Sequence, residues 1–239
     1  MAVCPETTAN EPKPKVIQAG DVGSLVSRFM AKGFGSSGLV AHHTNTPWPM
    51  EPTKDSHPKL YEECQKVSPS ENDEKSQAKF AQFATEGRGY YSIMATRPTT
   101  IGYALRDSPV ALLAWIYEKL RDWSDDYAWT DDEILIWVSI YYFSTAGPEA
   151  SSNVYYAMDH DTPPAFVTAA AYMDVPLGIS RFQNDLVVLP KLWNQTLGPI
   201  AYINEHARGG HFAAWEQPDA IVQDLHEMFR KDGSLGHLF

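Results

Sequence analysis

The 239-residue sequence predicts an α/β fold, a small sheet interrupted by an inserted helical cap. Near the start, a short apolar segment, a glycine-framed turn, an amphipathic segment and a second apolar run follow one another, which is the order of a βαβ unit. From about residue 74 to residue 159, apolar residues recur mainly at helical spacing. Later in the chain, short apolar runs are followed by polar loops, which indicates a return to the sheet.

The first unit contains a candidate nucleophile. A strand predicted over 15–18 leads into the turn QAGDVGS and a helix predicted over 24–32. Such a strand-to-helix turn holds its central residue, here Asp21, in a strained conformation, and small neighbours let the backbones pass. A carboxylate at this position needs no base to activate it and forms an alkyl ester. The pattern is short, so an ordinary helix with Asp21 as its N-cap remains an alternative.

A buried strand predicted over 38–42 completes this unit. The composition then shifts to Pro, Glu, Lys, Ser and Asp, which predicts an exposed segment over 47–76. Four helices are then predicted over 74–86, 98–108, 109–124 and 130–145, and the segment over 150–159 is interpreted as the end of the cap. Four tryptophans at helical spacing are interpreted as cap packing: Trp115, Trp123, Trp129 and Trp137.

The last part of the chain returns to the sheet. A strand is predicted over 167–175, with a loop over 176–185 leaving its carboxyl end. A short helix over 191–195, a last strand over 200–203 and a closing amphipathic helix over 218–231 follow. The resulting domain assignment is a disordered tail over 1–14, a core over 15–46 and 160–239, and a cap over 47–159.

Two polar loops after the late strands contain candidate partners for Asp21. They carry Asp185 and His211, so the chain order is nucleophile, acid and base. Gly209 and Gly210 allow the backbone to turn sharply ahead of His211. The alternatives are a helix-capping role for Asp185 and a histidine bonded to nearby backbone for His211.

Composition excludes several classes of partner. The net charge of −11 argues against nucleic acid and anionic membrane surfaces. Cys4 and Cys64 have no metal-ligand or disulfide spacing, which predicts a reducing compartment and no metal site. No cofactor is expected. The amino terminus lacks the apolar core of a signal peptide, and no apolar run approaches a membrane span. We therefore expect a soluble, cytoplasmic protein.

Three stretches together resemble one family. They are ARGGHFAAWEQPD at 207–219, GYALRDSPVALLAWIYEKL at 102–120 and QAGDVGSL at 18–25. They are similar to the corresponding stretches of the microsomal-type epoxide hydrolase family of α/β-hydrolases. The resemblance runs from about residue 15 to the carboxyl terminus and covers the second half of that architecture. It implies a partial α/β-hydrolase sheet, the last four strands, with the helical cap inserted.

The resemblance also implies a role for each matched residue. Asp21 would attack an epoxide carbon, His211 would be the general base, and Asp185 would be the acid of the charge relay. The Val22 backbone N–H would be an oxyanion donor. Two cap tyrosines in the family donate hydrogen bonds to the epoxide oxygen. By spacing and alignment, they match Tyr90, with Tyr91 as the competitor, and Tyr156, with Tyr155 as the competitor.

The sequence departs from the family in two ways. The region that supplies the first strands and an HGWP-like oxyanion loop is not found ahead of residue 15, so Val22 N–H would be the single oxyanion donor. The strand over 15–18 would then be an exposed edge that could pair with another chain or copy. Val22 also replaces the tryptophan that binds halide in related dehalogenases, which favours an epoxide over an alkyl halide.

The first hypothesis is therefore an epoxide hydrolase that converts a small or medium apolar epoxide and water into a vicinal diol. It could serve detoxification, aromatic hydrocarbon catabolism or secondary metabolism. The second is a catalytically impaired homologue that acts as a remnant or a partner-dependent binding protein. An esterase is disfavoured because Asp21 stands where an esterase has serine.

Overall fold

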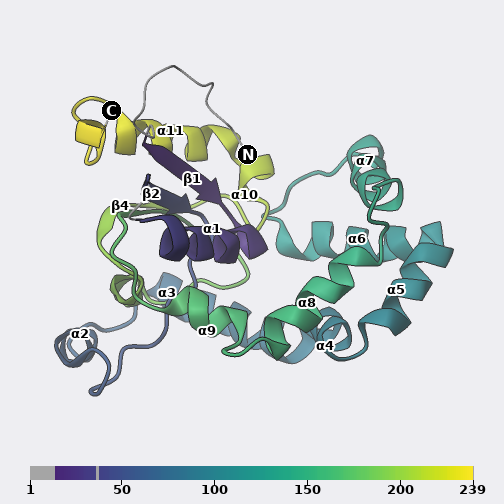
Figure 1. Cartoon of the computed structure of the whole chain (residues 1–239), viewed down its shortest axis with the longest axis horizontal. Coiled ribbons are helices and arrows are strands. Elements are labelled where there is room, and N and C mark those ends of the chain that lie inside the picture. Colours follow the sequence, from purple (N-terminus) through teal and green to yellow (C-terminus); the bar gives the residue numbers. More distant parts are fainter. Residues whose placement is uncertain (1–13, 36–37, 239) are drawn as a thin grey trace.

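The computed structural model describes residues 14–35 and 38–238. Its centre is a four-stranded sheet in the order β1-β2-β3-β4, with every neighbouring pair parallel (Figure 1). The carboxyl ends of parallel strands meet at one edge of a sheet, so the loops after the strands converge there. The strands are β1 (Lys15–Ala19), β2 (Leu39–Thr44), β3 (Leu177–Phe182) and β4 (Ile200–His206).

Helices cover both faces of the sheet. α11 (Pro218–Phe229) lies on one face and α1 (Asp21–Phe34) on the other, where α9 (Ala165–Ala170) packs against it (Figure 1). The buried Arg28 fixes α1, because its guanidinium donates hydrogen bonds to the carbonyls of Ala169 and Leu197, each at 2.8 Å. The orientation of α1, which begins directly after β1, is therefore tied to α9 and to the segment that precedes β4.

Between β2 and β3, the chain forms a series of helices, of which α4 to α8 lie together beside the sheet and α2 lies apart from them (Figure 1). Capping boxes begin two of them, Ser70 with Asp73 and Thr130 with Glu133. Leu105, Leu112 and Val138 form a buried core for the outer helices. The segments are α2 (Pro58–Cys64), α3 (Glu71–Gln82), a π-helix (Phe83–Gly87), α4 (Gly89–Thr96), α5 (Pro98–Asp107), α6 (Pro109–Trp123), α7 (Asp131–Tyr142) and α8 (Ala150–His160).

The predicted α/β class is confirmed, but one element was misplaced. The strand predicted over 167–175 is wrong, because α9 occupies its first part and β3 lies inside the predicted loop. Gly178 is a residue of β3, and its lack of a side chain lets α11 pack closely against the strand. A Cβ there would lie 2.4 Å from the Met228 sulfur.

Most of the other elements lie near their predicted positions, and the predicted exposed segment over 47–76 contains α2 and the start of α3. Neither α4, which carries Tyr90, nor the short α10 (Ala213–Glu216) was predicted. A 3₁₀ helix (Lys191–Thr196) occupies the short helix predicted over 191–195. Nearly all of the tail predicted to be disordered, residues 1–13, lies outside the described residues. Among the helices that the structure describes, none has the length and apolar character needed to cross a membrane.

Candidate active site

Asp21 sits at a strained turn between β1 and α1. Its φ is +47°, a left-handed conformation that non-glycine residues adopt infrequently and that is often found at functional sites. Gly20 precedes it because nothing larger fits, since a Cβ there would lie 2.7 Å from Asn45 Oδ1. Gly20 is also the N-cap of α1, so the alternative interpretation of Asp21 as the N-cap is wrong. Asp21 therefore starts the helix from the position expected of a nucleophile elbow.

Asp21, Asp185 and His211 come together at the carboxyl edge of the sheet. His211 Nδ1 lies 2.8 Å from Asp185 Oδ1, and His211 Nε2 lies 3.6 Å from Asp21 Oδ1. The three residues follow β1, β3 and β4, respectively. The Asp185 and His211 side chains are buried, whereas the Asp21 side chain is 54% exposed because it opens into a pocket. Asp185 therefore holds Nδ1 of the imidazole, and Nε2 faces Asp21.

The mutual charges of the three residues set their protonation. Burial alone would raise the pKa of Asp21, but the hydrogen bond and charge of His211, with the Val22 N–H, lower it. Burial alone would lower the pKa of His211, but Asp185, and to a lesser extent Asp21, raise it to about 10. At neutral pH, Asp21 is therefore an ionised carboxylate facing an imidazolium.

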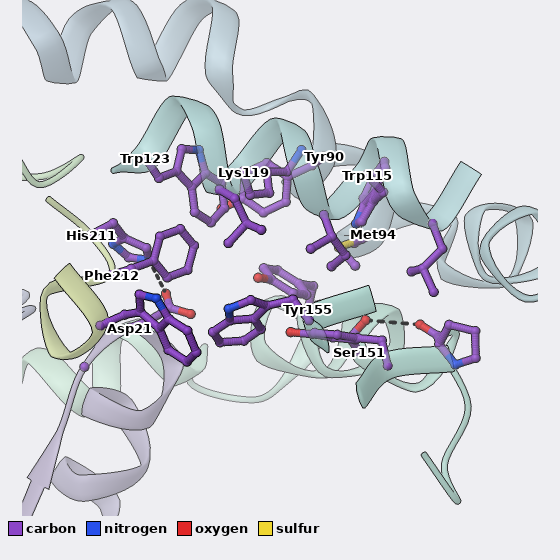
Figure 2. A pocket seen from close by; sticks show the side chains of 18 of the residues that line it. Asp21, Tyr90, Met94, Trp115, Lys119, Trp123, Ser151, Tyr155, His211 and Phe212 are labelled. Atoms are coloured by element: carbon purple, nitrogen blue, oxygen red, sulfur yellow. Dashed lines mark hydrogen bonds and ion pairs between the residues drawn. The ribbon is translucent and has the colours of Figure 1, made fainter. Parts of the chain in front are cut away.

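A pocket of about 360 Å³ extends from Asp21 and His211 into the helical group (Figure 2). Its walls are mainly aromatic and aliphatic, so an apolar molecule would lose most of its contact with water there. The lining includes Met94, Leu105, Leu112, Trp115, Ile116, Leu120, Trp123, Trp137, Tyr141, Phe212 and Trp215. Within the described part of the chain, no cluster of three or more His, Cys, Asp or Glu residues could hold a metal ion.

Comparisons with known proteins agree with this geometry. A curated relative from Stigmatella aurantiaca, provisionally named an epoxide hydrolase, is 36% identical over 225 residues, 90% of this chain and 47% of its own. Epoxide hydrolase 1 from Sus scrofa is 34% identical over 151 residues, 57% of this chain and 33% of its own. The solved structure of Aspergillus niger epoxide hydrolase superposes with a TM-score of 0.73 at 33% identity, covering 95% of this chain and 53% of that one.

The chain is similar to epoxide hydrolases of the α/β-hydrolase fold. No protein-family model matches it. It spans about half the length of the first curated relatives it matches. The resemblance inferred from the three sequence stretches is therefore confirmed.

The tyrosines expected in this epoxide hydrolase family divide between the pocket and the surface. Tyr90 and Tyr155 line the pocket beside Asp21 (Figure 2). Tyr91 instead directs its hydroxyl to Asp159 at 2.5 Å. Tyr156 is 42% exposed and stacks on His160 with ring centroids 4.0 Å apart. The preference for Tyr156 over Tyr155 is therefore corrected, because one residue along a helix turns the side chain by about 100°.

Burial is the main cause that raises the pKa of both pocket phenols. The negative charge of Asp21 is the second cause that raises the pKa of Tyr90, and it is one of the smaller causes that raise the pKa of Tyr155. Both hydroxyls are therefore protonated at neutral pH and can donate hydrogen bonds to a ligand oxygen beside Asp21.

Sequence reasoning missed several residues of the site. Three of the four tryptophans interpreted as packing, all except Trp129, line the pocket. Trp123 also contacts His211 directly, since the two ring centroids lie 5.2 Å apart. Lys119 places its ammonium 4.7 Å from the Trp115 ring centroid, inside this aromatic wall. Asn45 also lines the pocket and accepts a hydrogen bond from Gln18 Nε2 at 3.1 Å. Its position directly after β2 is the feature of the sequence that could have indicated a site residue.

Proposed function

We propose that this chain carries out the two-step chemistry of an epoxide hydrolase. The observation that carries the proposal is the convergence of a carboxylate, a paired imidazole and two phenols on one apolar pocket. A carboxylate nucleophile accounts for a covalent step, and phenols account for protonation of a departing oxygen. The helical group α4–α8 would act as the cap, because it supplies most of the pocket wall opposite Asp21.

In the first step, an Asp21 carboxylate oxygen attacks one epoxide carbon and the carbon–oxygen bond of the ring breaks. The electron pair stays on the ring oxygen, which takes a proton from Tyr90 or Tyr155. These hydroxyls act where negative charge develops, in a site with little water, where such donors are most effective. The product of the step is an alkyl ester of Asp21 and a hydroxyl on the neighbouring carbon.

In the second step, His211 activates water against the ester. Ester formation removes the charge of Asp21, one of the two carboxylates that raise the pKa of His211, so the imidazolium then gives up its proton more readily. That proton restores the phenol, directly or through solvent. Neutral His211 next takes a proton from water, and the hydroxide attacks the ester carbonyl carbon. With Val22 N–H as the oxyanion donor, the tetrahedral intermediate collapses and the bond between the Asp21 carbonyl carbon and the substrate oxygen breaks. That oxygen takes the proton that came with the hydroxide, so the vicinal diol and the Asp21 carboxylate are released.

The walls of the pocket support a small or medium apolar epoxide as substrate. Such an activity suits detoxification, breakdown of aromatic compounds or tailoring of a secondary metabolite. The low cysteine content supports a reducing compartment such as the cytoplasm.

A second candidate function rests on the edge of the sheet. Among the strands that the structure describes, none pairs with the outer edge of β1. An unpaired edge is a template for another strand, so the chain could act only with a partner polypeptide or a second copy, or serve as a binding protein. This candidate predicts a chain that binds epoxides without turnover until the partner is supplied.

The deciding experiment incubates the chain with aryl and alkyl epoxides and follows diol release and intact protein mass, with Asp21→Asn as the control. Diol from the parent chain but not from the variant supports the hydrolase. An adduct equal to one substrate, without diol, supports alkylation with impaired hydrolysis. A folded chain that gives neither product contradicts the hydrolase and favours the second candidate.

A further inference from the structure

Three consecutive backbone N–H groups hold the loop that carries His211, two by bonds to the end of α6 and the segment just after it and one by bonds to Glu216. Gly209 N–H donates to Asp125 Oδ2 at 2.7 Å, and His211 N–H donates to the Trp123 carbonyl at 2.8 Å. Between them, Gly210 N–H donates to both carboxylate oxygens of Glu216 at 3.2 Å. Each of the three consecutive residues 209–211 therefore has a hydrogen-bond acceptor for its backbone N–H.

The two carboxylates of this arrangement are also linked to each other. Glu216 Oε2 accepts the backbone N–H of Asp125 at 2.6 Å, so Glu216 bridges the base loop and the segment after α6. Glu216 is 8% exposed, and burial raises its pKa. The ammonium of Lys79 on α3 supplies positive charge nearby: it contacts the Asn184 carbonyl, and Asp185, Asp125 and Glu216 all act on its pKa. We call the Trp123 carbonyl, Asp125 and Glu216 the loop clamp.

The glycines of the loop are required by this close approach. Gly209 has φ +106°, a region that side chains disfavour. A Cβ on Gly210 would lie 2.6 Å from the Trp123 carbonyl oxygen. The GGH sequence thus brings the backbone against the end of α6, and the clamp uses that contact to fix the position of His211.

The position of His211 matters more for one chemical step than for the other. A general base must lie within ~2.6–3.2 Å of the atom it deprotonates, and a displacement of ~1 Å can cost ~100-fold in rate. Attack on the epoxide uses the Asp21 carboxylate and the phenols of Tyr90 and Tyr155. Neither Asp125 nor Glu216 contacts any of these groups through a hydrogen bond.

We propose that Asp125 and Glu216 are positioning residues for His211, and that they serve hydrolysis of the Asp21 ester rather than its formation. This rests on the proposed epoxide hydrolase function. Loosening the clamp displaces the base loop while the nucleophile and phenols stay in place. The enzyme would then stall as the covalent ester.

The test separates the two steps by rapid mixing and intact mass. In Glu216→Ala and Asp125→Ala, we expect hydrolysis of the ester to slow by ~10–100-fold, with formation of the ester changed by less than ~3-fold, so the adduct accumulates. Asp125→Asn keeps an acceptor oxygen and should recover most of the rate, and Glu216→Gln should be intermediate. Asp122→Asn removes a charge from the same segment at an exposed side chain and is the matched control. Equal slowing of both steps, or an unchanged hydrolysis step, overturns the proposal.

A second measurement does not depend on activity. The imidazole nitrogens of His211 can be titrated by NMR in the parent chain and in the two alanine variants. Because Asp185 is a main cause of the raised pKa, displacement of His211 from Asp185 should lower it. An unchanged pKa in folded variants overturns the clamp. If the parent chain turns over no epoxide, the proposed function fails, while this titration still decides whether the clamp positions His211. If the alanine variants do not fold, Asp125→Asn and Glu216→Gln are used for the same comparison.

Discussion

The phenol rings of Tyr90 and Tyr155 lie 5.8 Å apart and nearly perpendicular, at 85°, beside the Asp21 carboxylate (Figure 2). Tyr90 comes from α4 and Tyr155 from α8, two helices that pack directly on each other. The pair therefore depends on one helix contact, which places both hydroxyl donors over the same end of the pocket.

Removal of these hydroxyls should slow ester formation. We expect Tyr90→Phe and Tyr155→Phe each to reduce the rate of the first step by ~100-fold, since loss of one donor to a developing oxyanion costs ~10²–10³. The double variant should be slower than either. Single-turnover adduct formation, followed by intact mass, measures the effect.

Tyr156→Phe is the matched control, because it removes the same hydroxyl one residue away, on the exposed side of α8. Its rate should equal that of the parent chain. Slow ester formation in Tyr156→Phe with a normal rate in Tyr155→Phe would restore the assignment made from the sequence alignment.

The raised pKa of His211 should make stability depend on pH. The pKa rises from 6.5 to about 10 on folding, so the contribution of His211 is fully present below pH 6.5 and is lost as the pH approaches 10. Urea unfolding across this range should show the parent chain losing stability faster with rising pH than His211→Gln. Parallel pH curves for the two proteins would mean that His211 is not held as an imidazolium by Asp185.

The sequence carried enough local information to predict which three residues meet at the candidate site. A glycine-framed turn, and polar loops that follow strands, are determined by backbone conformation and sheet topology, both of which leave short-range patterns. Asp21, Asp185 and His211 were found in this way, although Asp185 follows a strand that was predicted too early. The error in the strand did not change this prediction, because Asp185 follows both the predicted strand over 167–175 and the observed β3.

Side-chain direction in the helical group could not be predicted in the same way. Tyr155 and Tyr156 are adjacent and identical, and only the packing of α8 on α4 determines which one faces Asp21. Trp123 shows the same limit: its helical spacing indicated packing, yet it also lines the pocket and contacts His211. Tertiary contacts of this kind leave no periodic signal in a single sequence.

The left-handed conformation of Asp21 should be measurable as strain. We expect Asp21→Gly to be more stable than Asp21→Ala by ~1 kcal/mol, because a Cβ is disfavoured by ~1–2 kcal/mol at such a φ whereas glycine is not. Both variants lose the carboxylate, so the comparison isolates the backbone. Chemical denaturation gives the difference in the free energy of unfolding.

The control for this prediction is an exposed position within α1. At Val26, an exposed residue in the middle of α1, the order should reverse, with Val26→Ala more stable than Val26→Gly by ~1 kcal/mol, because glycine weakens a helix interior. The same order at both positions would argue against the strained elbow.

On the face of the sheet covered by α11, Asp224 forms a buried hub. It is 1% exposed and accepts hydrogen bonds from β3 and β4. The donors are Ser180 Oγ at 2.5 Å, His206 Nε2 at 2.6 Å, Asn204 Nδ2 at 2.7 Å and Tyr202 hydroxyl at 2.9 Å. One carboxylate thus joins α11 to two strands whose following loops carry Asp185 and His211.

Loss of this hub should destabilise the whole core. Asp224→Ala leaves several buried donors unpaired at once, so we expect a loss of ~3–5 kcal/mol in the free energy of unfolding. Asp224→Asn keeps one acceptor oxygen and should lose less, while Tyr202→Phe removes one of four donors and should cost ~1 kcal/mol. Asp219→Asn, at an exposed site in the first turn of the same helix, should cost less than ~1 kcal/mol. If Asp224→Ala cost no more than Asp219→Asn, the four hydrogen bonds would contribute nothing net, and α11 would be held on the sheet by apolar contacts such as Met228 with Ala41.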